Sequence, residues 1–205
     1  MKILDLVQGS PEWLAVRRTY VTASEMASVL KVRGAYKSRQ MLLKHKLEGE
    51  PEPNAFAANL FARGHMAEAG LTKDAEEALG MPFQSLVCVD EETGILASID
   101  NINLEYGVIV ETKNCGTEKK LGPAREGIIW EPYRVQILAQ MFVAKVKIGF
   151  MLMRNEATDE LHLVPVNTDD VTTKRILEET AAFRKEWDVA KNTSAQLDKV
   201  CAVSV

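Results

Sequence analysis

Apolar residues follow two different spacings along the chain, one typical of helices and one typical of strands. A spacing of three and four residues predicts helices over 10–18, 22–30, 38–47, 55–79, 130–143 and 169–190. Short β-branched runs between turn-forming residues predict strands over 83–89, 94–99, 107–113, 148–153 and 160–166. Strands set between helices are typical of an α/β fold, with a mixed central β-sheet flanked by helices.

The segments between these elements are expected to form loops, and the end of the chain a tail. Residues 115–127 contain three glycine or proline breaks, which predicts a polar loop that lies over a substrate. The residues after 190 are expected to form the tail. The length of 205 residues suits one domain over 1–205, with its core motifs in 10–145 and a C-terminal hairpin and helix in 148–190.

The predicted strands over 94–99 and 107–113 bring chemically active residues close together. Asp100 follows the first strand and opens a predicted turn, while Glu111 and Lys113 lie in the second strand. Because alternate residues of a strand share a face, Glu111 and Lys113 are expected to point to one side. Asp100 and the backbone carbonyl of Thr112 are expected to converge there. Two carboxylates and a carbonyl are hard-oxygen ligands suited to Mg²⁺ or Mn²⁺.

A site of this kind suits the hydrolysis of a phosphodiester. A bound metal ion draws charge from the phosphoryl oxygens and lowers the pKa of a bound water. Lys113 is expected to position that water or to deprotonate it, and deprotonation requires that the neighbouring cation lowers the lysine pKa. The same residues are also explained by a solvated Glu111–Lys113 pair beside a turn that begins at Asp100.

A second group of polar residues lies between the first two predicted helices. Arg17 and Arg18 lie in the last turn of the first helix, and Thr22 and Ser24 stand at the start of the next, where Thr22 and Glu25 have the spacing of a capping box. A guanidinium beside a hydroxyl-rich helix start can bind an anion. A capped helix beside a solvated arginine explains these residues without an anion.

Composition limits the classes of protein that the chain can belong to. A net charge of −4 argues against a protein that coats nucleic acid, but a nuclease needs positive potential only along a groove. Three widely spaced cysteines exclude a disulfide framework and a four-cysteine iron–sulfur cluster, and they indicate a reducing cytoplasm. The polar N-terminal segment does not resemble a signal peptide, and lysines interrupt the longest apolar stretch, so no membrane span is expected.

Basic residues concentrate in one part of this acidic chain. They are Lys31, Arg33, Lys37, Arg39, Lys44 and Lys46. This segment can follow a phosphate backbone, contact another subunit or simply be solvated, and the sequence does not distinguish these roles.

Four motifs, taken together, resemble the phage lambda-type alkaline exonucleases, also called YqaJ-type viral recombinases, within the PD-(D/E)xK nuclease superfamily. The motifs follow one another in the order of that family and span most of the chain. They are W-x3-R-x4-TAS (Trp13, Arg17 and Thr22–Ala23–Ser24), G-x3-E (Gly64 and Glu68), S-x-D with E-x-K (Ser98, Asp100, Glu111 and Lys113), and an aromatic residue before a glutamine (Tyr133 and Gln136).

The resemblance implies a role for each matched position. Asp100, Glu111 and the Thr112 carbonyl would bind Mg²⁺ or Mn²⁺, with two ions in each active site, and Lys113 would be the catalytic lysine. Glu68 would be an acidic helper. The other matched residues would surround the 5′-phosphate and the scissile strand, and they are Arg17, Thr22, Ser24, Ser98 and Gln136.

The family also implies an activity and an assembly. The expected protein is a cytoplasmic 5′→3′ exonuclease on double-stranded DNA ends that leaves 3′ single-stranded tails for phage or prophage recombination. A homotrimeric ring and a single-strand annealing recombinase partner belong to the same expectation. Another PD-(D/E)xK DNA nuclease, either an endonuclease or an exonuclease of opposite polarity, is an alternative. A catalytically silent protein that binds DNA ends is another, although Asp100, Glu111 and Lys113 together argue against it.

The chain departs from the family pattern at two places. Asn101 stands where a glycine usually follows the metal aspartate, and asparagine is expected to preserve a turn there because it tolerates left-handed backbone angles. Thr112 and Asn114 replace the usual residues on either side of the lysine. Neither change removes a chemical group from the site.

Overall fold

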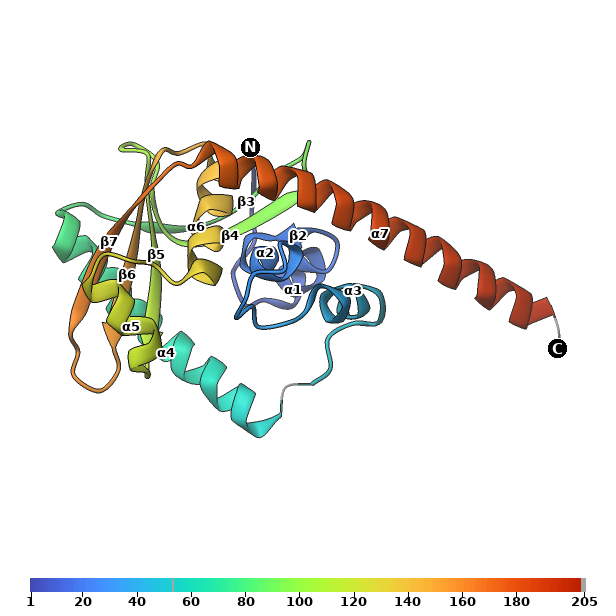
Figure 1. Ribbon diagram of the computed structural model, residues 1–205, viewed down its shortest axis with the longest axis horizontal. Coiled ribbons are helices and arrows are strands. Elements are labelled where there is room, and N and C mark those ends of the chain that lie inside the picture. Colours follow the sequence, from blue (N-terminus) through green and yellow to red (C-terminus); the bar gives the residue numbers. More distant parts are fainter. Residues whose placement is uncertain (53, 204–205) are drawn as a thin grey trace.

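A seven-stranded mixed β-sheet forms the centre of the molecule (Figure 1). The structure is a computed structural model, which describes the chain over residues 1–52 and 54–203; side chains 56–58, 60–61, 65, 118–119 and 195–203 are outside the description. The strand order is β1-β3-β4-β5-β6-β7, and β2 pairs with β4. Their bounds are β1 Lys2–Leu4, β2 Val21–Thr22, β3 Gln84–Asp90, β4 Ile95–Asn103, β5 Val108–Cys115, β6 Ile148–Asn155 and β7 Leu161–Asn167.

The sheet is mixed because of two parallel pairs. β5 pairs with β6 in parallel, with α6 in the connection between them, and β2 pairs with β4 in parallel. All other pairs are antiparallel, including the predicted hairpins β4–β5 and β6–β7. The predicted fold class is therefore confirmed. The two short strands β1 and β2 were not predicted, because two or three residues are too few to show an alternating pattern.

All of the predicted helices begin close to the expected positions. Ser10 caps α1, and Ser38 caps α3, each through a side-chain oxygen that accepts a backbone N–H. The bounds are α1 Pro11–Arg17, the 3-10 turn η1 Ala23–Glu25, α2 Met26–Val29, α3 Arg39–Glu48, α4 Ala55–Leu79, α5 Glu118–Arg125, α6 Glu131–Ala144 and α7 Asp170–Val203. Within the described part of the chain, no helix combines the length and the apolar character needed to cross a membrane.

Strand β5 packs against different helices on its two faces. Val108 and Val110 join a cluster with Ala75 of α4, whereas Ile109 lies in the main core with Ile137 of α6. This alternation follows the two-residue period of a strand. It places Glu111 and Lys113 on the same face as Ile109, toward α6.

The predicted turn at residues 100–103 is wrong, because β4 continues through it to Asn103. Pairs Gln84–Ile102 and Leu86–Ile99 differ in register by one, so Asp100 and Asn101 face the single residue Ser85 of β3. This is a β-bulge, a feature that re-aims side chains beside active sites. Asn101 therefore needs no left-handed turn; it is fully buried, pairs with Val110 in the strand and donates its side-chain N–H to the Val110 carbonyl at 3.2 Å.

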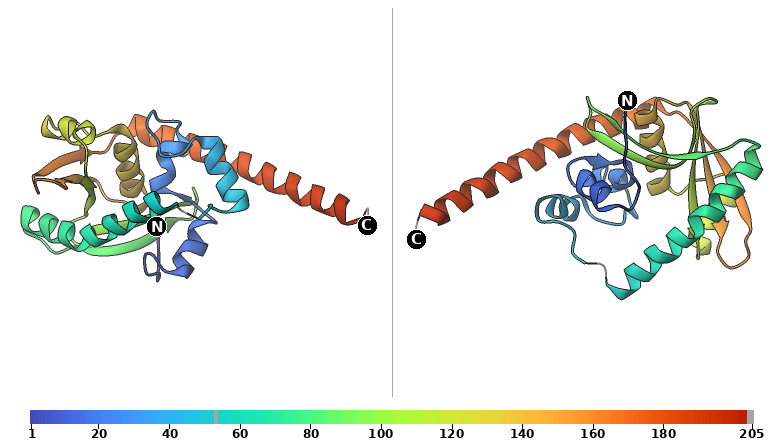
Figure 2. Two further views of the ribbon diagram at one scale, coloured as in Figure 1. Left: turned by 90° about the horizontal axis from the view of Figure 1, so that it is seen from below. Right: turned by 180° about the vertical axis from the view of Figure 1, so that it is seen from behind.

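Two other loop predictions are also wrong. Residues 115–127 were expected to be a loop, but their middle forms helix α5, since Leu121 and Ala124 gain burial in the core despite the helix-breaking Pro123. The residues after 190 were expected to be a tail, but α7 continues to Val203. Both views in Figure 2 show the end of α7 extending well beyond the rest of the molecule.

Candidate active site

A small cavity of about 160 Å³ collects almost all of the predicted site residues. It is lined by segments from α1, β2, η1, α4, β4, β5 and α6. The predicted members are Arg17, Thr22, Ser24, Glu68, Ser98, Asp100, Glu111, Lys113 and Gln136. The side chain of Thr112 is buried and does not line the cavity, so the role of its carbonyl stays a prediction.

The carboxylate of Glu111 is at the centre of the polar contacts. Its side chain is only 2% exposed. Oε1 accepts hydrogen bonds from Gln136 Nε2 at 2.7 Å and lies 2.6 Å from Lys113 Nζ. Oε2 accepts a hydrogen bond from Gln140 Nε2 at 2.6 Å. Two amides and an ammonium therefore hold both oxygens of one buried carboxylate.

Asp100 supplies the second carboxyl group, and it is half-buried. Burial, followed by the nearby charges of Glu111 and Glu68, raises the pKa of Asp100 to about 7, against the opposite effect of Lys113. A carboxyl with a raised pKa beside a second carboxylate is an electrostatically unfavourable arrangement. A bound cation between the two groups would remove the repulsion.

Lys113 is surrounded by an acidic group and an aromatic ring. Burial by itself lowers the pKa of Lys113, but the charge and hydrogen bond of Glu111 outweigh this effect, and the pKa is raised. Its Nζ also lies 5.2 Å from the ring centre of Tyr133. The raised pKa keeps the proton on Lys113 in this arrangement of side chains, and a lowering of its pKa by a bound cation stays a prediction.

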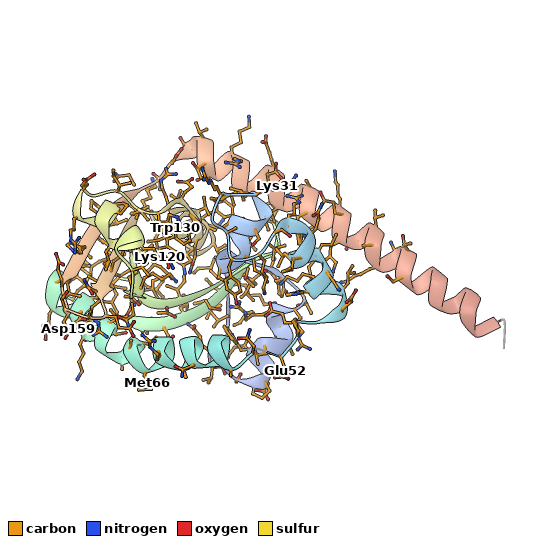
Figure 3. All side chains as sticks on the ribbon, turned by 60° about the horizontal axis from the view of Figure 1, so that its bottom comes forward. Lys31, Glu52, Met66, Lys120, Trp130 and Asp159 are labelled. Atoms are coloured by element: carbon orange, nitrogen blue, oxygen red, sulfur yellow. The ribbon has the colours of Figure 1, made fainter. Side chains whose placement is uncertain are left out.

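A second lysine continues this arrangement toward the surface. Lys120 of α5 donates to the hydroxyl of Tyr133 at 2.7 Å, and its Nζ lies 4.9 Å from the ring centre of Trp130. Figure 3 shows the labelled Lys120 and Trp130 close together. The segment expected to be a loop over the substrate thus brings a cation, as part of a helix, to the same Tyr133 ring that Lys113 approaches.

The predicted anion-binding residues form the other side of the cavity. Arg17 Nη2 donates to Ser24 Oγ at 3.3 Å, and the hydroxyls of Ser24 and Thr22 are 3.1 Å apart. The Arg17 guanidinium stacks on Trp13 at 4.4 Å, and Trp13 Nε1 donates to Ser98 Oγ at 2.8 Å. Burial lowers the pKa of Arg17, which is the effect of removing water from a cation. A partly dehydrated guanidinium beside hydroxyls is suited to a phosphate group.

Lys46 stabilises the backbone segment that carries the anion-binding residues. Its buried Nζ donates to the carbonyls of Arg17 at 2.9 Å and Tyr20 at 2.7 Å, and it pairs with Glu25 at 2.9 Å. Glu25 in turn accepts the backbone N–H of Thr22 at 2.9 Å, which confirms the predicted capping box. The helix that follows is short, so the anion site depends on Arg17 and the hydroxyls more than on a helix dipole.

The part of the chain that forms the cavity matches the sequence model of a known protein family. The YqaJ-like viral recombinase domain matches residues 12–147, which is more than half of the sequence and includes every residue of the cavity except Gln8 and Gly9. The chain belongs to this family. The match confirms the resemblance to the lambda-type exonucleases of the PD-(D/E)xK superfamily.

Solved structures support the fold of this family member. The alkaline exonuclease LHK-Exo from Laribacter hongkongensis matches with a TM-score of 0.75 and 21% identity over 96% of this chain and 100% of that chain. The structure of LHK-Exo in complex with dAMP matches with a TM-score of 0.78 and 19% identity, again over 96% of this chain and 100% of that chain. A phage-related exonuclease from Haemophilus somnus 129PT has a TM-score of 0.65 and 14% identity, covering 85% and 96% of the two chains. No curated protein matches the sequence.

The side chains of this YqaJ-family chain fit a hard divalent cation in part. Asp100 and Glu111 supply carboxylate oxygens, and their mutual repulsion gives a physical reason for a cation between them. Among the described side chains, no three His, Cys, Asp or Glu groups gather closely enough to hold a metal ion. The ligand set must therefore be completed by backbone oxygen, water or the substrate, which is the usual manner of Mg²⁺.

Two residues of the site were missed by sequence reasoning. Gln8 lines the cavity, and its hydrogen bond lowers the pKa of Asp100 against the larger raising effects. Gln140 contacts Glu111 directly. Gln140 stands four residues after Gln136 on one helix, and this i, i+4 spacing was the signal that could have identified it. Gln8 stands in a segment without periodic spacing and gave no such signal.

Proposed function

We propose that this protein is a Mg²⁺- or Mn²⁺-dependent exonuclease that digests linear double-stranded DNA in the 5′→3′ direction. The observation that carries the proposal is one cavity in which Asp100, Glu111 and Lys113 meet a cationic, hydroxyl-lined pocket around Arg17. The product would be duplex DNA with 3′ single-stranded tails, which a single-strand annealing recombinase could use in phage or prophage recombination. The cytoplasm is the matching location.

Two carboxylates would provide the metal-binding part of the reaction. Asp100 and Glu111, with the carbonyl of Thr112, would hold one or two ions, and Glu68 at the cavity wall would assist them. When bound, such ions lower the pKa of a water molecule and withdraw charge from the phosphoryl oxygens. Gln136 and Gln140 keep the Glu111 carboxylate in one orientation through their hydrogen bonds.

Lys113 would supply a positive hydrogen-bond donor at the reacting phosphate. Its proton is retained because Glu111 raises its pKa against the effect of burial. An ammonium stabilises negative charge that develops in the transition state and can also orient the attacking water. Deprotonation of the water by Lys113 would additionally require a bound cation that lowers the lysine pKa.

The pocket around Arg17 would decide which DNA end is cut. A terminal phosphate held by Arg17, Ser24 and Thr22 would place the first phosphodiester of that strand beside Asp100 and Glu111, because all five line one small cavity. Such an arrangement favours a 5′-phosphorylated end and stepwise removal of nucleotides from it.

Digestion of a linear duplex tests the proposal. The 5′-phosphorylated duplex should be degraded with Mg²⁺, more slowly when the end carries a 5′-hydroxyl, and not at all with EDTA. End-labelling of each strand gives the polarity. Cleavage of closed circular DNA, release of nucleotides from the 3′ end, or full activity in EDTA would contradict the proposal.

Arg17→Ala should remove the preference for a 5′-phosphate. A hydrogen bond to a charged group contributes about 1.5–3 kcal/mol, so we expect kcat/KM on phosphorylated ends to fall about 10- to 100-fold. Activity on 5′-hydroxyl ends should change much less. Arg18→Ala is the matched control, because Arg18 is the next residue, is exposed and does not line the cavity. An unchanged ratio between the two ends in the Arg17 variant would show that phosphate binds elsewhere.

A homotrimeric ring around DNA is the proposed assembly. The channel of such a ring would need cations on its surface, and the structure limits which basic residues between Lys31 and Lys46 can supply them. Two of the basic residues are internal: Arg39 pairs with Glu179 and Glu186 of α7, and Lys46 holds the Arg17 segment. The remaining cations of the segment, such as the exposed Lys31 and Arg33, would have to supply the positive surface. Light scattering should give three times the chain mass of 22.8 kDa, and a monomer with distributive digestion would exclude the ring.

A further inference from the structure

Gln140 is a buried amide at the point where α6 meets two strands of the sheet. Its side chain is 1% exposed. Nε2 donates to Glu111 Oε2 on β5 at 2.6 Å and to the Ser98 carbonyl on β4 at 3.3 Å. Ser98 precedes Asp100 by two residues, so one amide group connects the strands that carry both acidic residues of the site.

The surroundings of Gln140 determine the orientation of its amide. A carboxylate only accepts hydrogen bonds, so the NH₂ group must face Glu111, and the opposite orientation would direct Oε1 at two acceptor oxygens. Oε1 then lies buried without a hydrogen-bond partner among the described residues. A buried unsatisfied acceptor destabilises a fold. The residue is therefore arranged for its contact with Glu111 rather than for its own stability.

Gln136 and Gln140 act on different oxygens of the same carboxylate. Gln136 donates to Oε1, which Lys113 also contacts, whereas Oε2 has Gln140 as its only described hydrogen-bond donor. Without Gln140, the carboxylate can rotate about the Oε1 contacts. Rotation would displace Oε2 relative to Asp100, and a cation held between two carboxylates depends on that spacing.

We propose that Gln140 is a positioning residue that sets the Glu111 carboxylate, and the β4 segment before Asp100, in the geometry that binds the divalent cation. This inference rests on the proposed function, because it concerns the same metal site. Groups that hydrogen-bond to metal-binding side chains commonly contribute about 10- to 100-fold in metal affinity or activity. The position and burial of Gln140 are those of such a group.

Gln140→Leu tests the inference, since leucine retains much of the volume and removes the donor. Binding of Mn²⁺ alone, followed by electron paramagnetic resonance of the free ion, should show a dissociation constant about 10- to 100-fold higher than in the wild type. In digestion assays the Mg²⁺ concentration for half-maximal rate should rise in parallel. The KM for DNA at saturating Mg²⁺ should remain close to that of the wild type.

Ile137→Val is the matched control for a packing defect in the same helix. Ile137 is fully buried, and its apolar side chain cannot donate a hydrogen bond to Glu111. Its truncation to valine costs about 0.5–1.5 kcal/mol of stability. This control should lower the melting temperature and leave Mn²⁺ affinity unchanged. If Gln140→Leu does not fold, Gln140→Met provides the same loss of the donor with a more flexible side chain.

The outcomes separate the inference from the proposed function. If the wild type itself shows no saturable Mn²⁺ binding and no activity with Mg²⁺ or Mn²⁺, the proposed function fails. If the wild type binds Mn²⁺ and the Gln140 variant binds it equally well, Gln140 is only a structural residue and the inference is overturned. A selective loss of Mn²⁺ affinity in a variant with a normal melting temperature supports the inference.

Discussion

Asp100→Asn is expected to reduce metal-dependent hydrolysis of linear duplex DNA by about 10³-fold or more, because stabilisation of transition-state charge by a bound metal is worth several kcal/mol. Asparagine has nearly the same shape as aspartate but lacks its negative charge. The variant should also bind Mn²⁺ much more weakly than the wild type. Steady-state digestion and Mn²⁺ titration measure the two effects.

The Asp100 variant should remain folded, and the direction of the pKa shift gives the reason. Burial, then Glu111, raises the pKa of Asp100 to about 7 in the folded protein, from an ordinary value near 3.8. A carboxyl whose pKa is raised on folding destabilises the fold once it ionises, and this cost grows as the pH rises from about 4 through 7. At pH 8 without metal, Asp100→Asn should therefore melt at the same temperature as the wild type or higher.

Asp90→Asn is the matched control, since Asp90 is a buried aspartate on the neighbouring strand β3. It accepts hydrogen bonds from the backbone and hydroxyl of Thr93 and pairs with Lys145. Burial raises the pKa of Asp90, but these contacts outweigh the effect and lower it, so its stabilisation is lost as the pH falls into the acidic range. Asp90→Asn should lower stability by about 1–3 kcal/mol and keep activity. Full activity in the Asp100 variant would reject the proposed metal site.

Lys113→Met is expected to lower kcat by about 10²–10³-fold while DNA binding changes little. Methionine preserves the length of the aliphatic chain and removes the ammonium, which lies 2.6 Å from Glu111. A donor that acts on charge present only in the transition state contributes to kcat and not to ground-state binding. Single-turnover digestion measures the effect on the catalytic rate, and an equilibrium assay in Ca²⁺ measures the effect on DNA binding.

Lys113→Arg is a useful comparison for the same position. Arginine keeps the positive charge but has a planar, larger group that cannot occupy the position between Glu111 and Tyr133 in the same way. We expect partial activity, between the wild type and the methionine variant. A Lys113→Met protein with a rate close to the wild type would refute the catalytic role of the ammonium.

Local patterns in the sequence were sufficient for much of the fold. The capping box of Thr22 and Glu25 marked the start of a helix, and the helical spacing over 55–79 identified α4 to the residue. These predictions succeeded because capping and periodic burial depend on residues close together in the chain. The motif residues were also sufficient to name the family and most of the cavity.

Tertiary contacts decided the points at which local patterns were misleading. Asp100–Asn103 resembled a turn, but neighbouring strands on both sides bury Asn101 and Asn103, whose amides bond to the carbonyls of Val110 and Pro82. Pro123 resembled a break, but Leu121 and Ala124 pack into the core and stabilise a helix around it. In both cases burial against distant residues outweighs the local preference.

The sequence by itself determined most of the elements, the fold class and the identity of the acidic and basic groups, because these depend on residue type and spacing. Only the tertiary structure decided that Lys46 and Arg39 make internal contacts, that Glu111 raises the pKa of Lys113, and that Gln140 donates to Glu111. The reason is physical: a charge or an amide acquires its role from the groups that surround it, and those groups come from segments far apart in the chain.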